Sequence, residues 1–146
     1  METIKNSRHT WNDSYLVHIP MIDKQHIKFF KIFDQLAALS NSEDSYYQLS
    51  EIIDELDKYT QIHFQTEEAL MRKAKTPDYD LHLFQHSIFR KKIEEFKIAY
   101  SYHNSVLQQQ MVNFMRKWFL MHISDVDGKY ADSVHEFMNE KGWAIE

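Results

Sequence analysis

The sequence predicts an all-α protein, and three observations lead to this prediction. The chain of 146 residues contains only two glycines and two prolines, residues that multi-stranded folds need at their turns. Apolar residues recur at intervals of three and four, which is the spacing of one helix face. Polar breaks divide this pattern into four long stretches without an internal repeat. A chain of this length is also about one domain long, so we expect residues 1–146 to form a single domain.

The first helix is predicted to begin near Asp23, a candidate N-cap that follows Pro20, and to end in a linker at residues 40–44. Residues 1–20 precede this helix and carry apolar side chains at every second or fourth place toward their end. We expect them to lie over the helices as an extended N-terminal arm.

The second helix is predicted over residues 45–75, and Thr76, Pro77 and Asp78 separate it from a third helix over residues 79–102. The fourth helix follows almost at once and becomes irregular near residues 127–128, before a short terminal helix over residues 129–141. Because short connections favour antiparallel neighbours, we expect an up-down-up-down four-helix bundle. The bundle would span residues 22–127, with 128–146 as a C-terminal segment.

The composition excludes several kinds of function. Because the chain has no cysteine, it can form no disulfide, thiolate zinc site or iron–sulfur cluster, and any metal must be held by His, Asp or Glu. The net charge is −5 and the cations form no stripe, so we expect no nucleic acid partner. The N-terminus lacks the apolar stretch of a secretory signal, and no apolar run approaches the roughly 20 residues that span a bilayer. We therefore expect a cytoplasmic protein with no membrane partner.

Six polar residues lie on the apolar faces of the four predicted helices, where core residues are expected. They are His26, His63, Glu67, His82, His86 and His122. A lone histidine on such a face is more often a hydrogen-bonded core residue than a ligand. An ionised glutamate in an apolar core, however, is costly unless it is paired or bound to a metal. One metal site would satisfy all six residues together, so the pattern predicts a metal centre inside the bundle.

The spacing of these residues supports the same prediction. His63 and Glu67 are four residues apart, as are His82 and His86, so each pair lies one turn apart on one helix face. Asp127 follows His122 by five residues, which places it about 140° away on a regular helix. A π-type turn, or a looser backbone beside the glycine at 128, is needed to bring Asp127 inward.

In these residues the chain resembles the hemerythrins, in particular the bacterial hemerythrin-like proteins. The resemblance covers nearly the whole length of the chain. It is carried by Ile22-Asp23-Lys24-Gln25-His26, by His63-Phe64 with Glu67-Glu68 and Leu70-Met71, by His82 and His86, and by Trp118 with His122-Ile123 and Asp127. The seven ligand positions occur in the family's order.

The resemblance implies two iron ions, cycling between Fe2+ and Fe3+ and joined by an oxo or hydroxo bridge. Carried over to this chain, one iron would be bound by His82, His86 and His122, and the other by His26 and His63, with Glu67 and Asp127 bridging the two. This ligand set leaves one position open, on the iron with two histidines. The resemblance therefore implies reversible dioxygen binding, for oxygen carriage, storage or delivery.

The resemblance also implies an apolar pocket around the open position. The residues expected to form its walls are Phe29, Phe64, Trp118, Phe119 and Ile123. Phe119 departs from the family pattern, since a leucine commonly follows the tryptophan there. The difference bears on the shape of the pocket and leaves the ligands unchanged.

We expect that the chain is not an enzyme, because di-iron proteins that activate oxygen use carboxylate-rich ligands with two Glu-x-x-His motifs. No glutamate in this chain has a histidine three residues later. Two alternatives remain open: a domain that senses oxygen or redox state, and a di-iron enzyme acting on peroxide or nitric oxide. A zinc hydrolase is a weaker alternative, because the His-Glu-x-x-His motif does not occur.

Overall fold

A computed structural model describes residues 15–40, 43–122 and 128–141 of the chain. Within these residues the backbone forms five α-helices and no strand, which confirms the all-α prediction. The helices are α2 (Pro20–Ala37), α3 (Glu43–Ala74), α4 (Tyr79–Ser101), α5 (Leu107–Met121) and α6 (Gly128–Glu140). Among them, none combines the length and the apolar character that crossing a bilayer requires.

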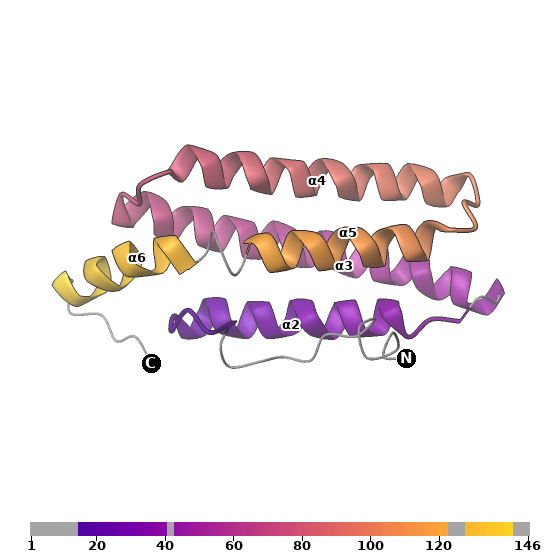
Figure 1. Ribbon diagram of the computed structural model, residues 1–146, viewed down its shortest axis with the longest axis horizontal. Helices are drawn as coiled ribbons and strands as arrows, with labels where there is room; N and C mark the ends of the chain where they lie inside the picture. Colours follow the sequence, from indigo (N-terminus) through magenta and orange to yellow (C-terminus); the bar gives the residue numbers. More distant parts are fainter. Residues whose placement is uncertain (1–14, 41–42, 123–127, 142–146) are drawn as a thin grey trace.

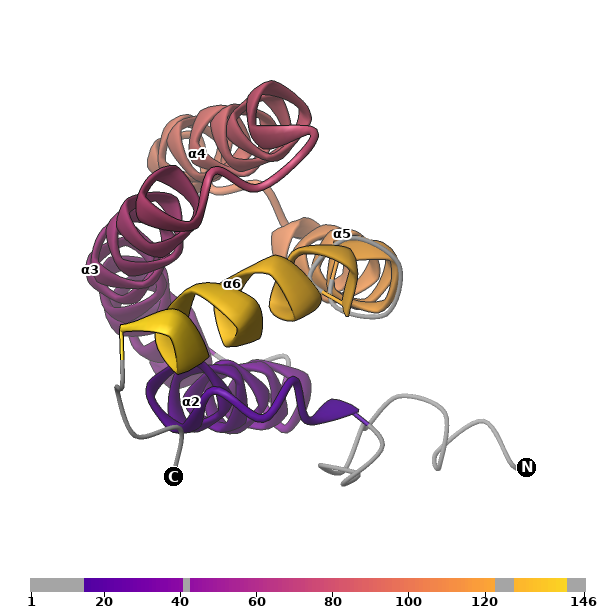
Figure 2. The same ribbon diagram turned by 90° about the vertical axis from the view of Figure 1, so that its left-hand side faces the viewer.

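Helices α2 to α5 form an antiparallel four-helix bundle. They run alternately in opposite directions, and the end-on view shows them around a common interior (Figures 1 and 2). Helix α2 packs against α3 and α5, and α4 packs against the same two helices. The short helix α6 crosses one end of the bundle (Figure 2). The up-down-up-down prediction and the short C-terminal helix are therefore confirmed.

The predicted start of the first helix is wrong. Helix α2 begins at Pro20, with Ile19 as its N-cap, and Asp23 lies in the first turn. A proline is well suited to this place, because the first N–H groups of a helix have no partner within the helix. The Asp23 carboxylate instead accepts a hydrogen bond of 2.8 Å from the N–H of Val17, and so ties the segment before the helix to its first turn.

Replacing Asp23 with alanine is expected to lower the free energy of unfolding by about 1–3 kcal/mol, because it removes the acceptor of a buried N–H group. Denaturant unfolding of the variant and the parent, in the same metal state, measures this loss. Asp54→Ala is the matched control, since Asp54 is exposed on α3. Equal transition midpoints for Asp23→Ala and Asp54→Ala would contradict the role given to this hydrogen bond.

Two apolar clusters make up the core, and the buried histidines and Glu67 lie where the two clusters meet. The larger cluster fills the space between α2, α3, α4 and α5. The smaller cluster closes the end of the bundle and consists of Val17, Ile19, Ile22, Met71, Ala131, Val134 and Met138. On α2, His26 lies between Ile22 of the smaller cluster and Phe29 of the larger one. On α3, Glu67 lies in the same way between Met71 and Phe64, so apolar layers seal the site on both sides.

Candidate metal centre

Glu67 is the centre of the site and is fully buried, with 0 % of its surface exposed. His63 lies one turn earlier on α3, and its Nε2 is 3.4 Å from Oε1 of Glu67. His26 approaches from α2, with its Nε2 3.8 Å from Oε2. These three residues place one potential ligand atom each within 4.8 Å of one another, and so form a first group that could hold a metal ion.

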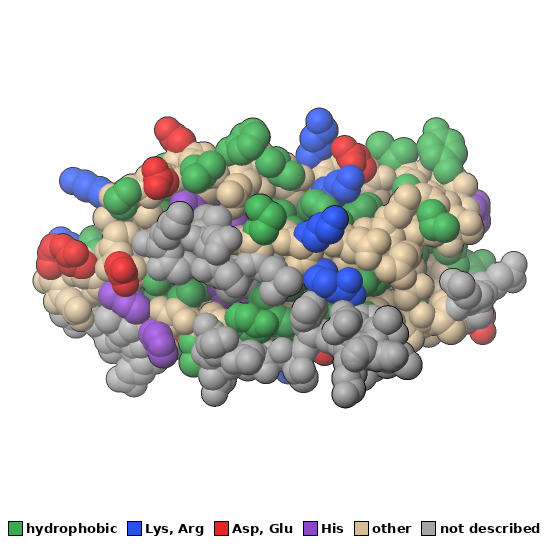
Figure 3. Space-filling view, viewed as in Figure 1, with side chains coloured by type: hydrophobic (Ala, Val, Ile, Leu, Met, Phe, Trp, Pro, Cys, Tyr) green, Lys and Arg blue, Asp and Glu red, His purple; other side chains and the backbone are tan. Residues whose placement is uncertain are grey.

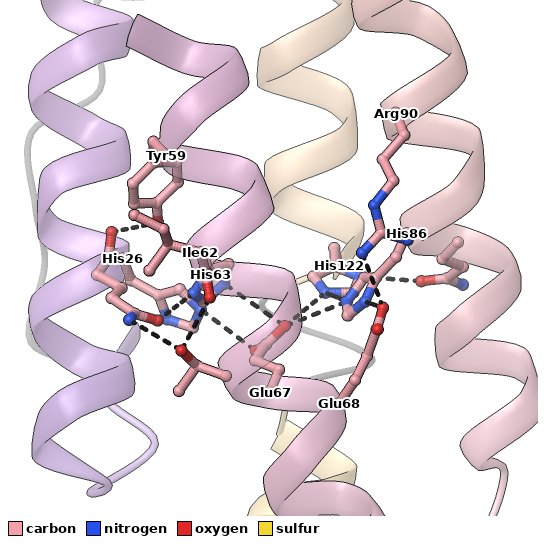
Figure 4. Close-up of polar contacts among 12 residues, drawn as sticks. His26, Tyr59, Ile62, His63, Glu67, Glu68, His86, Arg90 and His122 are labelled. Carbon is pink, nitrogen blue, oxygen red and sulfur yellow. Dashed lines mark hydrogen bonds and ion pairs between the residues drawn. The ribbon is translucent and has the colours of Figure 1, made fainter.

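A second group forms on the other side of the same carboxylate. His86 from α4 and His122 from the end of α5 place their Nε2 atoms 3.1 Å and 3.7 Å from Oε1 of Glu67. The two Nε2 atoms are 3.3 Å from each other. Glu67 therefore belongs to both groups, and Figure 4 shows it between His26 and His63 on one side and His86 and His122 on the other.

Three of the imidazoles are oriented by oxygen atoms of neighbouring side chains. The Nδ1 atom of His63 lies 2.6 Å from Oε1 of Gln25, and that of His122 lies 3.0 Å from Oε1 of Gln85. The Nδ1 atom of His86 lies 2.8 Å from Oε2 of Glu68. Because these oxygens accept hydrogen bonds, each Nδ1 carries the proton and donates it. In the neutral form of each ring the lone pair is then on Nε2, which faces Glu67, and this is the tautomer in which such imidazoles bind metals.

Arg90 holds Glu68 in place. Its Nη2 donates to Oε2 of Glu68 over 3.2 Å, and its guanidinium lies over the ring of Phe64 at 5.2 Å from the centroid. Figure 4 shows Arg90, Glu68 and His86 in one chain of contacts that ends at the site. Arg90 therefore helps to hold the Glu68 carboxylate beside Nδ1 of His86.

The charge of Glu67 requires positive charge around it. Burial raises the pKa of Glu67, but the charge on His63 and hydrogen bonds from His122, His26 and His86 outweigh it, so the pKa lies well below its usual value. The carboxylate is thus ionised at neutral pH. A carboxylate oxygen and an imidazole lone pair repel each other, so the four Nε2 atoms near Glu67 must each carry a proton or share a metal cation with it. Imidazole nitrogen and carboxylate oxygen suit divalent transition metals such as iron, so the donor set fits a pair of metal ions.

Among the described residues, one predicted ligand, His82, stands apart from the two groups. His82 is buried one turn before His86, and its ring centroid is 6.2 Å from that of His122, but it is not a member of either group. Asp127 lies outside the described residues. Helix α5 ends at Met121, and His122 follows it as the C-cap with helical backbone angles.

A small cavity adjoins the ligands, with a volume of about 10 Å³. It is lined by His26, Phe29, Tyr59, Thr60, His63, Phe64, Trp118, Phe119 and His122. Four of the five residues expected as pocket walls are among them, and the fifth, Ile123, lies outside the described residues. The volume is about that of one water-sized sphere, so only a very small ligand fits without movement of side chains.

Phe119 closes the cavity through close aromatic contacts. Its ring stacks on Phe29 at 4.8 Å between centroids and meets Phe30 edge-on at 4.3 Å. It also meets the ring of His26 edge-on at 6.3 Å. Phe119, one of the residues in which this chain departs from the family pattern, therefore packs between the ring of His26 and the aromatic rings of the core.

Two kinds of residue at this site were not predicted from the sequence. The first are the hydrogen-bonding residues Gln25, Glu68 and Gln85, each of which directly adjoins a predicted ligand in the sequence. The second are Tyr59 and Thr60, which line the pocket and lie one turn before His63 on α3. The first set could have been found from its adjacency to predicted ligands in the sequence. The second could have been found from its helical spacing relative to His63.

Comparisons with known proteins agree with this geometry. The profile of the Hemerythrin HHE cation binding domain matches residues 17–133. A bacteriohemerythrin of Clostridium acetobutylicum is 32 % identical over 126 residues, covering 84 % of this chain and 98 % of that protein. A bacteriohemerythrin of Stenotrophomonas maltophilia is 28 % identical over 130 residues, covering 89 % and 84 %. A crystal structure of a hemerythrin variant superposes with a TM-score of 0.79 at 22 % identity, over 86 % of this chain and 96 % of that one, which shows the shared fold.

Proposed function

Because the chain belongs to the hemerythrin family, whose members hold a di-iron centre and bind oxygen, we propose that it binds dioxygen reversibly for carriage, storage or delivery. One observation carries the proposal. A single buried carboxylate, Glu67, is shared by two groups of imidazoles beside a small aromatic cavity. Residues 1–146 would act as one hemerythrin-like domain.

We assign the iron ligands as follows. One iron would be held by His26 and His63, the other by His82, His86 and His122, with Glu67 and Asp127 as bridges. The proximity of the described ligands supports all of this assignment except His82 and Asp127, which rest on the family pattern. When bound, the iron pair supplies the electrons that reversible oxygen binding requires.

The histidine-rich ligand set favours binding over oxidation chemistry. Imidazoles are neutral ligands, so a diferric centre with few carboxylates keeps a net positive charge that opposes further oxidation. Gln25, Glu68 and Gln85 hold three of the imidazoles in the tautomer that directs Nε2 inward. These residues therefore fix the ligands without adding a carboxylate to the metals, and this supports an oxygen-binding protein over an enzyme.

The cavity supports the same proposal. Its walls are mostly aromatic, and the hydroxyls of Tyr59 and Thr60 already donate to backbone oxygens, of Gln25 and Asp57 respectively. Water and acid promote the irreversible oxidation of such centres. A small cavity with these walls would exclude both and so keep oxygen binding reversible.

The proposal is tested by absorption spectra of the iron-loaded protein under argon, then air, then argon again. We expect a charge-transfer band that appears in air and disappears when oxygen is removed, over several cycles. The zinc-loaded protein is the control and should show no band. Conversion in air to a stable diferric spectrum, or steady consumption of peroxide or nitric oxide, would contradict the proposal in favour of an enzyme.

Replacing Phe119 with leucine should make the oxygen-dependent band decay several-fold faster in air, because the smaller side chain admits water to the cavity beside His26. The iron content should stay unchanged, since Phe119 is not a ligand. Phe33→Leu is the matched control, because Phe33 is equally buried on α2 but does not line the cavity. An unchanged decay in Phe119→Leu would show that this ring is ordinary core packing.

A further inference from the structure

The outward face of α4 exposes an unusual number of apolar side chains. Among the described residues, ten large hydrophobic side chains are exposed, and five of them lie on α4 or directly after it. These five are Leu81, Phe84, Ile88, Ile98 and Tyr102, with exposed fractions between 42 % and 80 %. Figure 3 shows green side chains along the edge where Figure 1 places α4, divided near the middle by blue and red ones.

The spacing along this face is that of a coiled coil. Residues 81, 84, 88, 91, 95, 98 and 102 follow one another at alternating intervals of three and four, and all seven are exposed. The two positions that are not apolar are Lys91 and Glu95, at the centre of the row. The opposite face of α4 already packs into the bundle through His82, His86, Phe89, Ile93 and Phe96. A repeat of this kind on a second face is the pattern with which a helix meets another helix.

We propose that the α4 helix of a second copy of this chain packs antiparallel on this row, about a twofold axis near Ile93. In this register Phe84 faces Tyr102 of the second copy, and Ile88 faces Ile98 of the second copy. Lys91 faces Glu95 of the second copy, and the symmetry repeats each pair on the other side of the axis. Every apolar side chain in the paired region then meets an apolar one, and every charge meets its opposite. Leu81 lies just outside the paired region.

The two charges select this arrangement over the others. A parallel pair of helices would place Lys91 against Lys91 and Glu95 against Glu95, which is repulsive. An antiparallel shift by one heptad in either direction would place both charges against apolar side chains. Desolvating a charge without a partner is costly, so these registers are disfavoured.

The charges that flank the row are held within each chain. Lys92 lies 3.3 Å from Glu95 and over the rings of Phe96 and Phe114, at 5.9 Å and 5.7 Å. Glu94 lies 3.2 Å from Lys97, which in turn contacts Asp57 at 2.6 Å. These intrachain contacts reduce the repulsion between like flanking charges of the two copies near the axis. A single helix pair is at the low end of specific interface sizes, so we expect association that depends on concentration.

Sedimentation velocity of the full chain over about a hundredfold range of concentration tests the proposal. We expect a monomer at the low end and a dimer at the high end. Lys91→Glu and Glu95→Lys should each abolish the dimer, and the double variant Lys91→Glu/Glu95→Lys should restore it, because the reversed charges pair again. Circular dichroism should show unchanged helix content, since both positions are exposed.

Phe84→Glu and Met21→Glu form a second comparison, because both replace an exposed apolar residue but Met21 lies on α2, away from the row. Only Phe84→Glu should abolish the dimer. A chain that stays monomeric at every concentration would overturn the proposal, as would a dimer that survives Lys91→Glu. Failure of the double variant to recover the dimer would overturn the antiparallel register. None of these readouts depends on the metal centre.

Discussion

Replacing Glu67 with glutamine is expected to abolish the binding of two metal ions. Glu67 belongs to both groups of ligands, so the substitution removes a shared negative ligand from both at once. An amide is neutral and cannot bridge two cations as a carboxylate does. Metal analysis of the iron-loaded, desalted variant should therefore find at most one iron per chain.

The glutamine variant keeps the size of the side chain, so a loss of metal reports on charge and not on packing. Glu55→Gln, on the exposed side of the same helix, is the matched control and should retain the iron content of the parent. An unchanged iron content in Glu67→Gln would show that this carboxylate does not bridge two metals.

Replacing Glu68 with alanine is expected to weaken metal affinity by about 10- to 100-fold, although Glu68 is not assigned as a ligand. Its carboxylate accepts the Nδ1 hydrogen of His86 at 2.8 Å and so fixes the tautomer and the orientation of that ring. Competition with a chelator, with zinc as a redox-inert probe, measures the affinity. Glu55→Ala is the control.

Arg90→Ala should have a smaller effect in the same assay, because Arg90 contacts Glu68 and the ring of Phe64 and so lies one residue further from the proposed metals than Glu68. Comparing the loss of metal affinity in the two variants shows how the effect of a contact changes from the surface toward the proposed metal site. If the metal affinity of Glu68→Ala stayed within twofold of that of Glu55→Ala, the proposed role of Glu68 in orienting His86 would be contradicted.

Much of the fold and the principal site could be predicted because the relevant signals lie within single helices. Polar residues on an apolar helix face are visible in the sequence, and the spacing of His63 and Glu67 places them on one side of α3. The structure brings these two together with His26, His86 and His122, as a shared interior requires.

Adjacency to a predicted ligand could have indicated the orienting residues, but their partners could not be predicted, because each contact joins two different helices. Gln25 and His63 are 38 residues apart, His122 and Gln85 are 37 apart, and Glu68 and His86 are 18 apart. Such pairs depend on how one helix is rotated against another, which helical spacing alone does not determine. Spacing identifies the face of a residue and not its partner.

The start of α2 was mispredicted for a local reason. Asp23 and Pro20 both signal a helix N-terminus, and the two signals compete when they are three residues apart. The structure resolves the competition by using Pro20 to begin the helix and Asp23 to bind the segment before it. A capping side chain can therefore act one turn inside the helix when the preceding chain folds back over it.

Titration of the metal-free chain with ferrous iron under argon tests the central proposal most directly, because two groups of ligands around one carboxylate should hold two ions. Binding is followed by circular dichroism at the wavelengths of the metal transitions. Metal analysis of the saturated protein then gives the stoichiometry. We predict saturation at two irons per chain. Saturation at one iron per chain, with no further binding in excess metal, would contradict the proposal that Glu67 is shared between two metal ions.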